Sequence, residues 1–194
     1  MQKETTNQIK TGVIVKEGYL GGFAFDGVNY RGYMRYSEIN KIVKQAFKKS
    51  FPDIRISCTG SSFSGGQECK GRLLAQKSEA VRSFEEFMQK VEAYYKEKGY
   101  CFQVFQYINT WQAQDLNYNE ALKMAYDSYI SRLKWGHSCE HLDELDKLIL
   151  KPRYYQALNY LNELYDSFNS CDNNSMVDYF SNLFYKFVYL QCEE

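Results

Sequence analysis

The sequence has only two prolines, no Cys-x-x-Cys pair and no long apolar run. A membrane helix needs about 18 consecutive apolar residues, and the start Met1–Glu4 lacks the apolar stretch of a signal peptide. These absences predict a soluble, cytoplasmic protein with no membrane partner. In that compartment we expect cysteines to be reduced, mostly buried thiols rather than a disulfide framework. They lie at positions 58, 69, 101, 139, 171 and 192.

Aromatic residues are abundant, with 18 Tyr, 13 Phe and 2 Trp making 17% of the chain. Such side chains supply a sizeable core, which excludes wholesale disorder. The length of 194 residues suits one domain or two small ones.

The net charge of zero conceals an asymmetry between the two halves of the chain. Residues 1–110 contain 17 Lys and Arg against 11 Asp and Glu, whereas residues 111–194 contain 7 against 13. The basic half is suited to an anionic partner. Equally, opposite charges can help the two halves dock on each other, and both interpretations stay open.

Hydrophobic periodicity predicts a mixed first half. Alternation and β-branched residues indicate strands, spacing of three and four residues indicates helices, and Asp26-Gly27 is typical of a hairpin turn. We expect strands near 13–15, 19–25 and 28–36, a helix from Ser37 to Phe51, strands at 54–58 and 68–74, a helix at 78–98 and a buried strand at 100–108. The order matches a ferredoxin-like, split βαβ antiparallel sheet with an extra N-terminal hairpin.

After residue 110 the period becomes helical. Stripes at 118–133, 142–149 and 157–168 predict three helices, the third with Pro152 in its first turn. A stripe after the Asn173-Asn174-Ser175 cap, bearing Phe180 to Val188, makes about four. The expected class is therefore α+β. We expect a partly disordered N-terminus (1–12), an α+β sheet domain (13–110) and an α-helical subdomain packed on it (111–194).

One stretch resembles a known family. Residues 39–74 contain a Lys-rich amphipathic helix, then Lys48-Lys49-Ser50-Phe51-Pro52-Asp53-Ile54-Arg55-Ile56-Ser57, then Ser64-Gly65-Gly66. This pattern resembles the large polyvalent protein-associated domain 29 of phage and plasmid proteins. The resemblance covers under a fifth of the chain and implies a bacterial mobile-element context (a phage, plasmid or integrative element) without implying a reaction.

Residues that carry catalytic chemistry form no recognisable set. His137, Cys139 and His141 are clustered, but a structural zinc site usually has four ligands in pairs, so we expect ordinary histidines and a buried thiol. Gly-x-Ser-x-Gly and His-Glu-x-x-His are absent. We therefore predict no enzyme, no metal and no cofactor, with a Cys/His enzyme built on Cys139 and His141 as a distant alternative.

The segment around residues 61–66 is a candidate anion-binding loop. Its members are Ser61, Ser62, Phe63, Ser64, Gly65 and Gly66. Backbone amides in such a loop can bind an anion, but the phosphate-loop order of glycines and lysine is missing. A hairpin connection is the simpler interpretation.

Cations interleaved with aromatic residues favour single-stranded nucleic acid, since bases stack on rings while cations neutralise phosphates. The candidate nucleic-acid or partner-binding residues are Arg31, Tyr33, Arg35, Lys41, Lys44, Lys48, Lys49, Arg55, Lys70 and Arg72. In the alternative, the tyrosines are partly core and the lysines a solvated face.

Tyrosine also suits protein interfaces, because its ring offers a large contact area at a low entropic cost. The leading hypothesis from sequence is a non-enzymatic mobile-element accessory protein that binds a macromolecule, with a host defence protein as one target. The second hypothesis is a single-stranded nucleic-acid or RNA-binding module. The sequence does not identify the protein partner or the oligomeric state.

Overall fold

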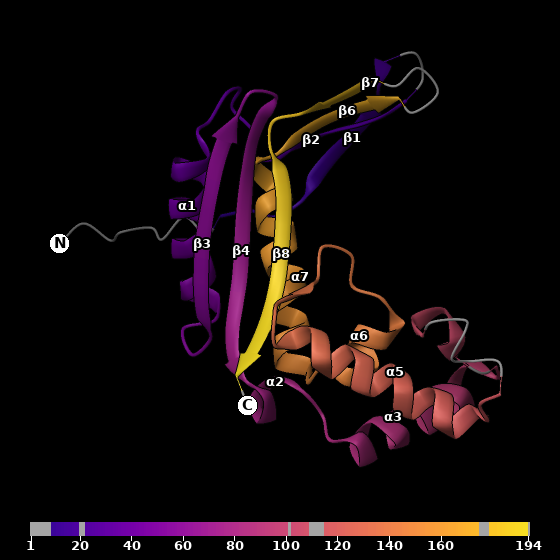
Figure 1. The fold of residues 1–194 in the computed structure, drawn as a ribbon. Helices are drawn as coiled ribbons and strands as arrows, with labels where there is room; N and C mark the ends of the chain where they lie inside the picture. Colours follow the sequence, from indigo (N-terminus) through magenta and orange to yellow (C-terminus); the bar gives the residue numbers. More distant parts are fainter. Residues whose placement is uncertain (1–8, 20–21, 101, 109–114, 175–178, 194) are drawn as a thin grey trace. The chain divides into compact units, whose positions relative to one another are not determined.

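The computed structural model describes residues 9–19, 22–100, 102–108, 115–174 and 179–193, and shows an α+β protein (Figure 1). By compactness the chain divides into two units. The first contains residues 1–73 and 157–189, and the second contains residues 74–156 and 190–194. The predicted boundary at residue 110 lies outside the described residues, as does most of the N-terminal segment predicted to be disordered.

The first unit contains a small antiparallel sheet with the strand order β1-β2-β6-β7. The strands are β1 (Val13–Glu17), β2 (Phe23–Gly27), β6 (Ser170–Asn174) and β7 (Tyr179–Asn182). β1 pairs with β2 from Val13↔Gly27 to Glu17↔Phe23, and β2 pairs with β6 on its other edge. β1 and β2 thus form an N-terminal hairpin, to which β6 and β7 are added, but the turn predicted at Asp26-Gly27 is wrong, because both residues belong to β2 and pair with Ile14 and Val13.

The predicted return strand at 28–36 is wrong. Gly27 donates its N–H to the carbonyl of Asn169 at 2.8 Å, and Asn29 donates to that of Ser167 at 2.7 Å. A Cβ on Gly27 would lie 2.2 Å from the Ser167 oxygen, so only glycine allows this approach. The chain leaving β2 is thus hydrogen-bonded to the residues that end the helix before Ser170, so it does not turn back to pair with β2.

The second sheet has the order β3-β4-β8-β5, and its first three strands begin in the first unit. They are β3 (Arg55–Phe63), β4 (Gly66–Gln76) and β8 (Tyr185–Glu193). Helices α1 (Tyr36–Ser50) and α7 (Pro152–Phe168) lie on one side of these strands (Figure 1). The predicted helix before Phe51-Pro52 and the predicted strands at 54–58 and 68–74 are confirmed.

The predicted last helix is wrong, because the chain after Ser170 forms β6, β7 and β8. Phe184, Val188, Leu190 and Cys192 are buried, whereas the odd-numbered residues of β8 are half-buried or exposed. That alternation has the period of a strand. The helical pattern seen in the sequence arose because Phe184 and Val188 satisfy both periods.

The described part of the second unit is mostly helical. Its elements are α2 (Lys77–Ala80), α3 (Phe84–Lys98), the 3₁₀ helix η2 (Val104–Tyr107), α5 (Tyr118–Leu133), β5 (His137–Ser138) and α6 (Glu144–Ile149). The helices predicted at 118–133 and 142–149 are confirmed, and the one predicted to follow Pro152 is α7. Among the described residues, no helix is long and apolar enough to cross a membrane.

Two other predictions in this unit need correction. The single helix at 78–98 is broken before Phe84, because Ser83 starts a new helix with a capping box to Glu86. The buried strand at 100–108 is replaced by η2, where the ring of Phe102 stacks on Tyr107 at 5.4 Å. Because this segment makes local ring contacts and not the hydrogen bonds of a strand, the last strand of the predicted order is missing. The ferredoxin-like order is therefore not clearly formed.

Candidate nucleic-acid interface

One face of β3-β4-β8 is turned away from the helices. On β4 the odd-numbered residues are buried, and a Cβ on Gly71 would lie 2.7 Å from the ring of Tyr165 on α7. Strand residues alternate between faces, so Glu68, Lys70 and Arg72 occupy the opposite side. No described helix of the first unit covers that side (Figure 1). We call it the open face.

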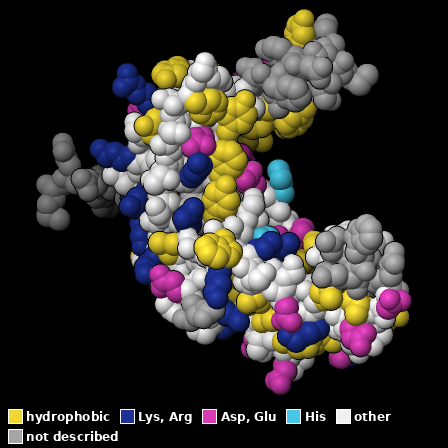
Figure 2. All heavy atoms as spheres, viewed as in Figure 1, with side chains coloured by type: hydrophobic (Ala, Val, Ile, Leu, Met, Phe, Trp, Pro, Cys, Tyr) yellow, Lys and Arg dark blue, Asp and Glu magenta, His cyan; other side chains and the backbone are white. Residues whose placement is uncertain are grey.

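Aromatic rings follow β8 along this face. Tyr185, Phe187 and Tyr189 alternate with inward-facing residues, and the rings of Phe187 and Tyr189 are nearly parallel at 6.4 Å. Phe63 on β3 extends the row, because its ring lies 5.8 Å from Tyr185. Phe63 and Tyr185 are 49% and 43% exposed, so neither ring belongs to the buried core. Hydrophobic side chains are visible in a column over β8 in Figure 2.

Cations from β4 lie beside these rings. The Lys70 ammonium is 5.7 Å from the centre of the Phe187 ring, and the Arg72 guanidinium is 5.8 Å from that of Tyr189. Arg55 on β3 is exposed. It is an even number of residues from Ser61 and Phe63, which contact open-face residues, so it lies on the same face of the strand. Lys and Arg side chains therefore line the aromatic row in Figure 2.

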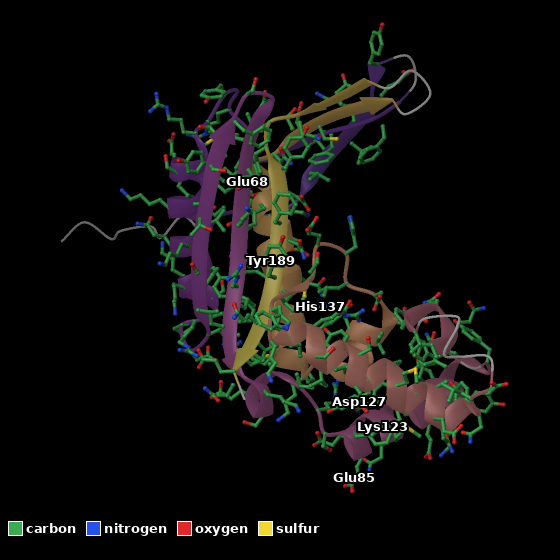
Figure 3. All side chains as sticks on the ribbon, viewed as in Figure 1. Glu68, Glu85, Lys123, Asp127, His137 and Tyr189 are labelled. Atoms are coloured by element: carbon green, nitrogen blue, oxygen red, sulfur yellow. The ribbon has the colours of Figure 1, made fainter. Side chains whose placement is uncertain are left out.

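Among the first-unit residues of these three strands, one acidic residue lies on the open face. Glu68 forms an ion pair with Lys70 at 2.7 Å and accepts a hydrogen bond from the Ser61 hydroxyl at 2.8 Å. These hydrogen bonds, that of Lys70 first, lower the pKa of Glu68. Figure 3 labels Glu68 on β4 and Tyr189 on β8. With Arg55 and Arg72 the face keeps a net positive charge.

The structure separates the cations predicted from the sequence. Arg55, Lys70 and Arg72 share the open face, but Lys41, Lys44, Lys48 and Lys49 belong to α1. α1 lies on the opposite side, where Asn40 donates to the carbonyl of Thr59 at 2.7 Å. Lys48 is already engaged, because its ammonium donates to the carbonyl of Ile54 at 2.7 Å. The helix lysines are therefore not part of the same surface.

Arg31, Tyr33 and Arg35 lie in the segment between β2 and α1. Gln67 of β4 holds the end of this segment: it donates to the carbonyl of Met34 at 2.6 Å and accepts the N–H of Tyr36 at 2.8 Å. Tyr33 is 76% exposed. The three residues are thus close in sequence to α1 but have no strand to align them as a stacking row.

The candidate anion loop is mostly strand. Ser61, Ser62 and Phe63 belong to β3, Gly66 begins β4, and Ser64-Gly65 alone form the turn. The segment is therefore the hairpin connection between β3 and β4, which was the simpler interpretation, and anion binding by its backbone amides stays a prediction. To the open face it contributes the Phe63 ring and the Ser61 hydroxyl that bonds to Glu68.

The Cys/His alternative gains no support from the described residues. Cys139 is fully buried, and it groups with His137 and Asp146 rather than with His141. Burial, followed by the charge of Asp146, raises the pKa of the Cys139 thiol well above its usual value. A protonated thiol with no exposed surface is a poor nucleophile.

Sequence reasoning missed the aromatic row, because it placed those rings on a helix. The signal was the alternation in residues 184–192, where Phe184, Val188 and Leu190 are separated by residues of the other face. Comparison of the chain with protein-family models, with curated proteins and with solved structures finds no match. The interface therefore rests on its own geometry.

Proposed function

We propose that this protein binds single-stranded nucleic acid through the open face, without catalysing a reaction. The observation that carries the proposal is the row Tyr185, Phe187, Tyr189 with Lys70 and Arg72 alongside it. Sheets that bind single strands stack two or three bases on aromatic side chains and neutralise the backbone with nearby cations.

The spacing of the rings supports this function. Residues two apart on a strand are separated by about 6.6 Å, so consecutive outward rings can each take a separate base of an extended strand. Stacking is tolerant of base identity, because every base has a π face. We therefore expect weak sequence preference and similar binding of single-stranded DNA and RNA.

A protein partner, the leading hypothesis from sequence, uses the same rings in a different way. Tyr and Phe anchors bury apolar area, and such an interface depends little on salt, whereas phosphate binding weakens steeply with salt. The placement of a β4 cation beside each of two β8 rings favours nucleic acid. The mobile-element context and the ferredoxin-like order stay predictions, and the proposal requires neither.

The test is fluorescence anisotropy of labelled oligo-dT and oligo-U twelve-mers with the purified full chain at 50 mM salt. We expect the variant Phe187→Ala/Tyr189→Ala to lose at least about fivefold in affinity per ring, because stacking is worth about 1–3 kcal/mol per base. The matched control, Tyr33→Ala/Tyr95→Ala, removes two rings that are 76% and 51% exposed and belong to none of the strands of the open face, and it should bind normally.

Two results would refute the proposal. One is that the folded wild-type protein binds neither oligonucleotide at 50 mM salt. The other is that the control variant loses as much affinity as the open-face variant. In the first case the rings would be tested as a protein interface, with loss of partner capture in the same double variant as the criterion.

A further inference from the structure

A buried group of unlike metal ligands lies in the second unit, apart from the open-face residues. It contains His137 from β5, Cys139 just after it and Asp146 from α6. One nitrogen, one sulfur and one carboxylate oxygen of these side chains all lie within 4.8 Å of one another. Cys139 and Asp146 are buried, and the His137 side chain is 15% exposed. Figure 3 labels His137.

The surrounding residues fix these ligands in place. Asp143 and Asp146 form the capping box of α6, in which Asp146 Oδ2 accepts the N–H of Asp143 at 2.9 Å. The other oxygen, Oδ1, accepts the Tyr129 hydroxyl at 2.7 Å and lies 3.2 Å from His137 Nε2. The Tyr129 ring also packs on the imidazole, with 4.4 Å between ring centres. Carboxylate and imidazole are therefore oriented by groups that remain when the ion binds.

The spacing fits a tetrahedral ion. With zinc–nitrogen and zinc–oxygen bonds of about 2.0–2.2 Å and a zinc–sulfur bond of about 2.3 Å, two ligand atoms lie about 3.4–3.6 Å apart. The observed 3.2 Å between His137 Nε2 and Asp146 Oδ1 is close to that value. The remaining pairs, within 4.8 Å, need to approach by at most about 1.4 Å.

We propose that His137, Cys139 and Asp146 bind one zinc ion. Nitrogen and sulfur ligands favour zinc over magnesium or calcium, which prefer sets of oxygen atoms. Binding converts the Cys139 thiol into a zinc-bound thiolate and releases its proton to solvent. His137 binds as the neutral imidazole with its proton on Nδ1, so the proton that Nε2 directs at Asp146 Oδ1 leaves Nε2 when the ion enters. Three protein ligands leave the fourth position for a water molecule. The ion links β5 to α6, so it should stabilise this unit.

The sequence pointed to a different set. His137, Cys139 and His141 are close in the chain, but His141 does not belong to the group, and Asp146 takes the third place. No spacing rule marks that aspartate, because it reaches the group through the fold of α6. His141 is consequently a matched control: it is a histidine of the same segment that the proposal leaves outside the site.

The experiment is a titration of the full chain, stripped of metal and kept reduced, with Co²⁺ as a spectroscopic probe and Zn²⁺ as competitor. We expect one equivalent of Co²⁺ to give thiolate-to-cobalt charge-transfer absorption and tetrahedral d–d bands, and Zn²⁺ to displace it, since zinc binds such sites more tightly. Zn²⁺ should also raise the Tm of the wild-type protein.

Variants then locate the site. Cys139→Ser should abolish the charge-transfer band, His137→Gln should weaken Co²⁺ binding at least about tenfold, and His141→Ala should leave both unchanged. His137 is half-buried, so His137→Gln carries the test if circular dichroism shows that Cys139→Ser is unfolded. The proposal is overturned if the folded wild type gives no charge-transfer band, or if the band persists in folded Cys139→Ser. It is also overturned if His141→Ala weakens binding as much as His137→Gln does.

Discussion

Reversing the charge of two open-face cations should change how nucleic-acid binding depends on salt. Each phosphate contact on a single strand contributes about −0.7 to the slope of log K against log salt concentration. Arg55, Lys70 and Arg72 are the three cations of the open face, so the wild-type slope should be about −2. Affinity should then fall about 20-fold between 50 and 200 mM salt.

In Lys70→Glu/Arg72→Glu only Arg55 remains, so the slope should be about −0.7 and affinity should fall about threefold over the same range. The control, Lys41→Glu/Lys44→Glu, changes the net charge by the same amount on α1, which covers the other side of the sheet. The assay is anisotropy of labelled oligo-U at four salt concentrations. The reasoning fails if the two double variants have the same slope, because net charge alone would then explain binding.

Three further predictions concern stability. Tyr165→Phe should cost about 1–2 kcal/mol in urea unfolding, since the buried hydroxyl bonds to Asn40 at 2.8 Å, whereas Tyr33→Phe at the surface should cost under about 0.5 kcal/mol. Gly71→Ala should cost about 1–3 kcal/mol, because the new Cβ lies 2.7 Å from the Tyr165 ring; wild-type stability would contradict that packing. Burial raises the pKa of the Cys69 thiol from 9.0 to about 12, so above pH 9 the thiol ionises in the unfolded chain before it does in the folded protein. The contribution of Cys69 to the free energy of unfolding is therefore complete below pH 9 and is lost as the pH rises from 9 toward 12. Cys69→Ala should reduce the fall in the free energy of unfolding between pH 8 and pH 10, measured by urea unfolding.

The helices were predictable where local signals and packing agree. α1 ends just before Phe51-Pro52, α7 begins at Pro152, and α5 follows the N-cap residue Asn117, which forms a capping box with Glu120. These signals act within a few residues, so they can be recognised without knowing the tertiary fold.

The C-terminal strands could not be recognised in the same way. Residues 184 and 188 are four apart and share a face in both a helix and a strand, so spacing alone does not decide between them. β8 forms because its neighbour β4, more than a hundred residues earlier, offers a partner edge. Such long-range pairing leaves little mark on local sequence.

The candidate binding residues illustrate a related limit. The sequence groups Arg55, Lys70 and Arg72 with the lysines of α1 because all are basic, but it does not say which layer of the fold each belongs to. The rings that complete the interface, Phe187 and Tyr189, come from the far end of the chain. Only the order of strands brings them beside β4.

The most direct test of the central claim is ultraviolet crosslinking of the full chain to oligo-U, followed by mass spectrometry of tryptic peptides. Cleavage after Lys186 places Phe187 and Tyr189 together in the C-terminal peptide of residues 187–194. The account predicts that this peptide carries the principal crosslink, and that the crosslink decreases in Lys70→Glu/Arg72→Glu. Crosslinks confined to peptides of α1 or of residues 28–35, or none from the folded protein, would contradict it.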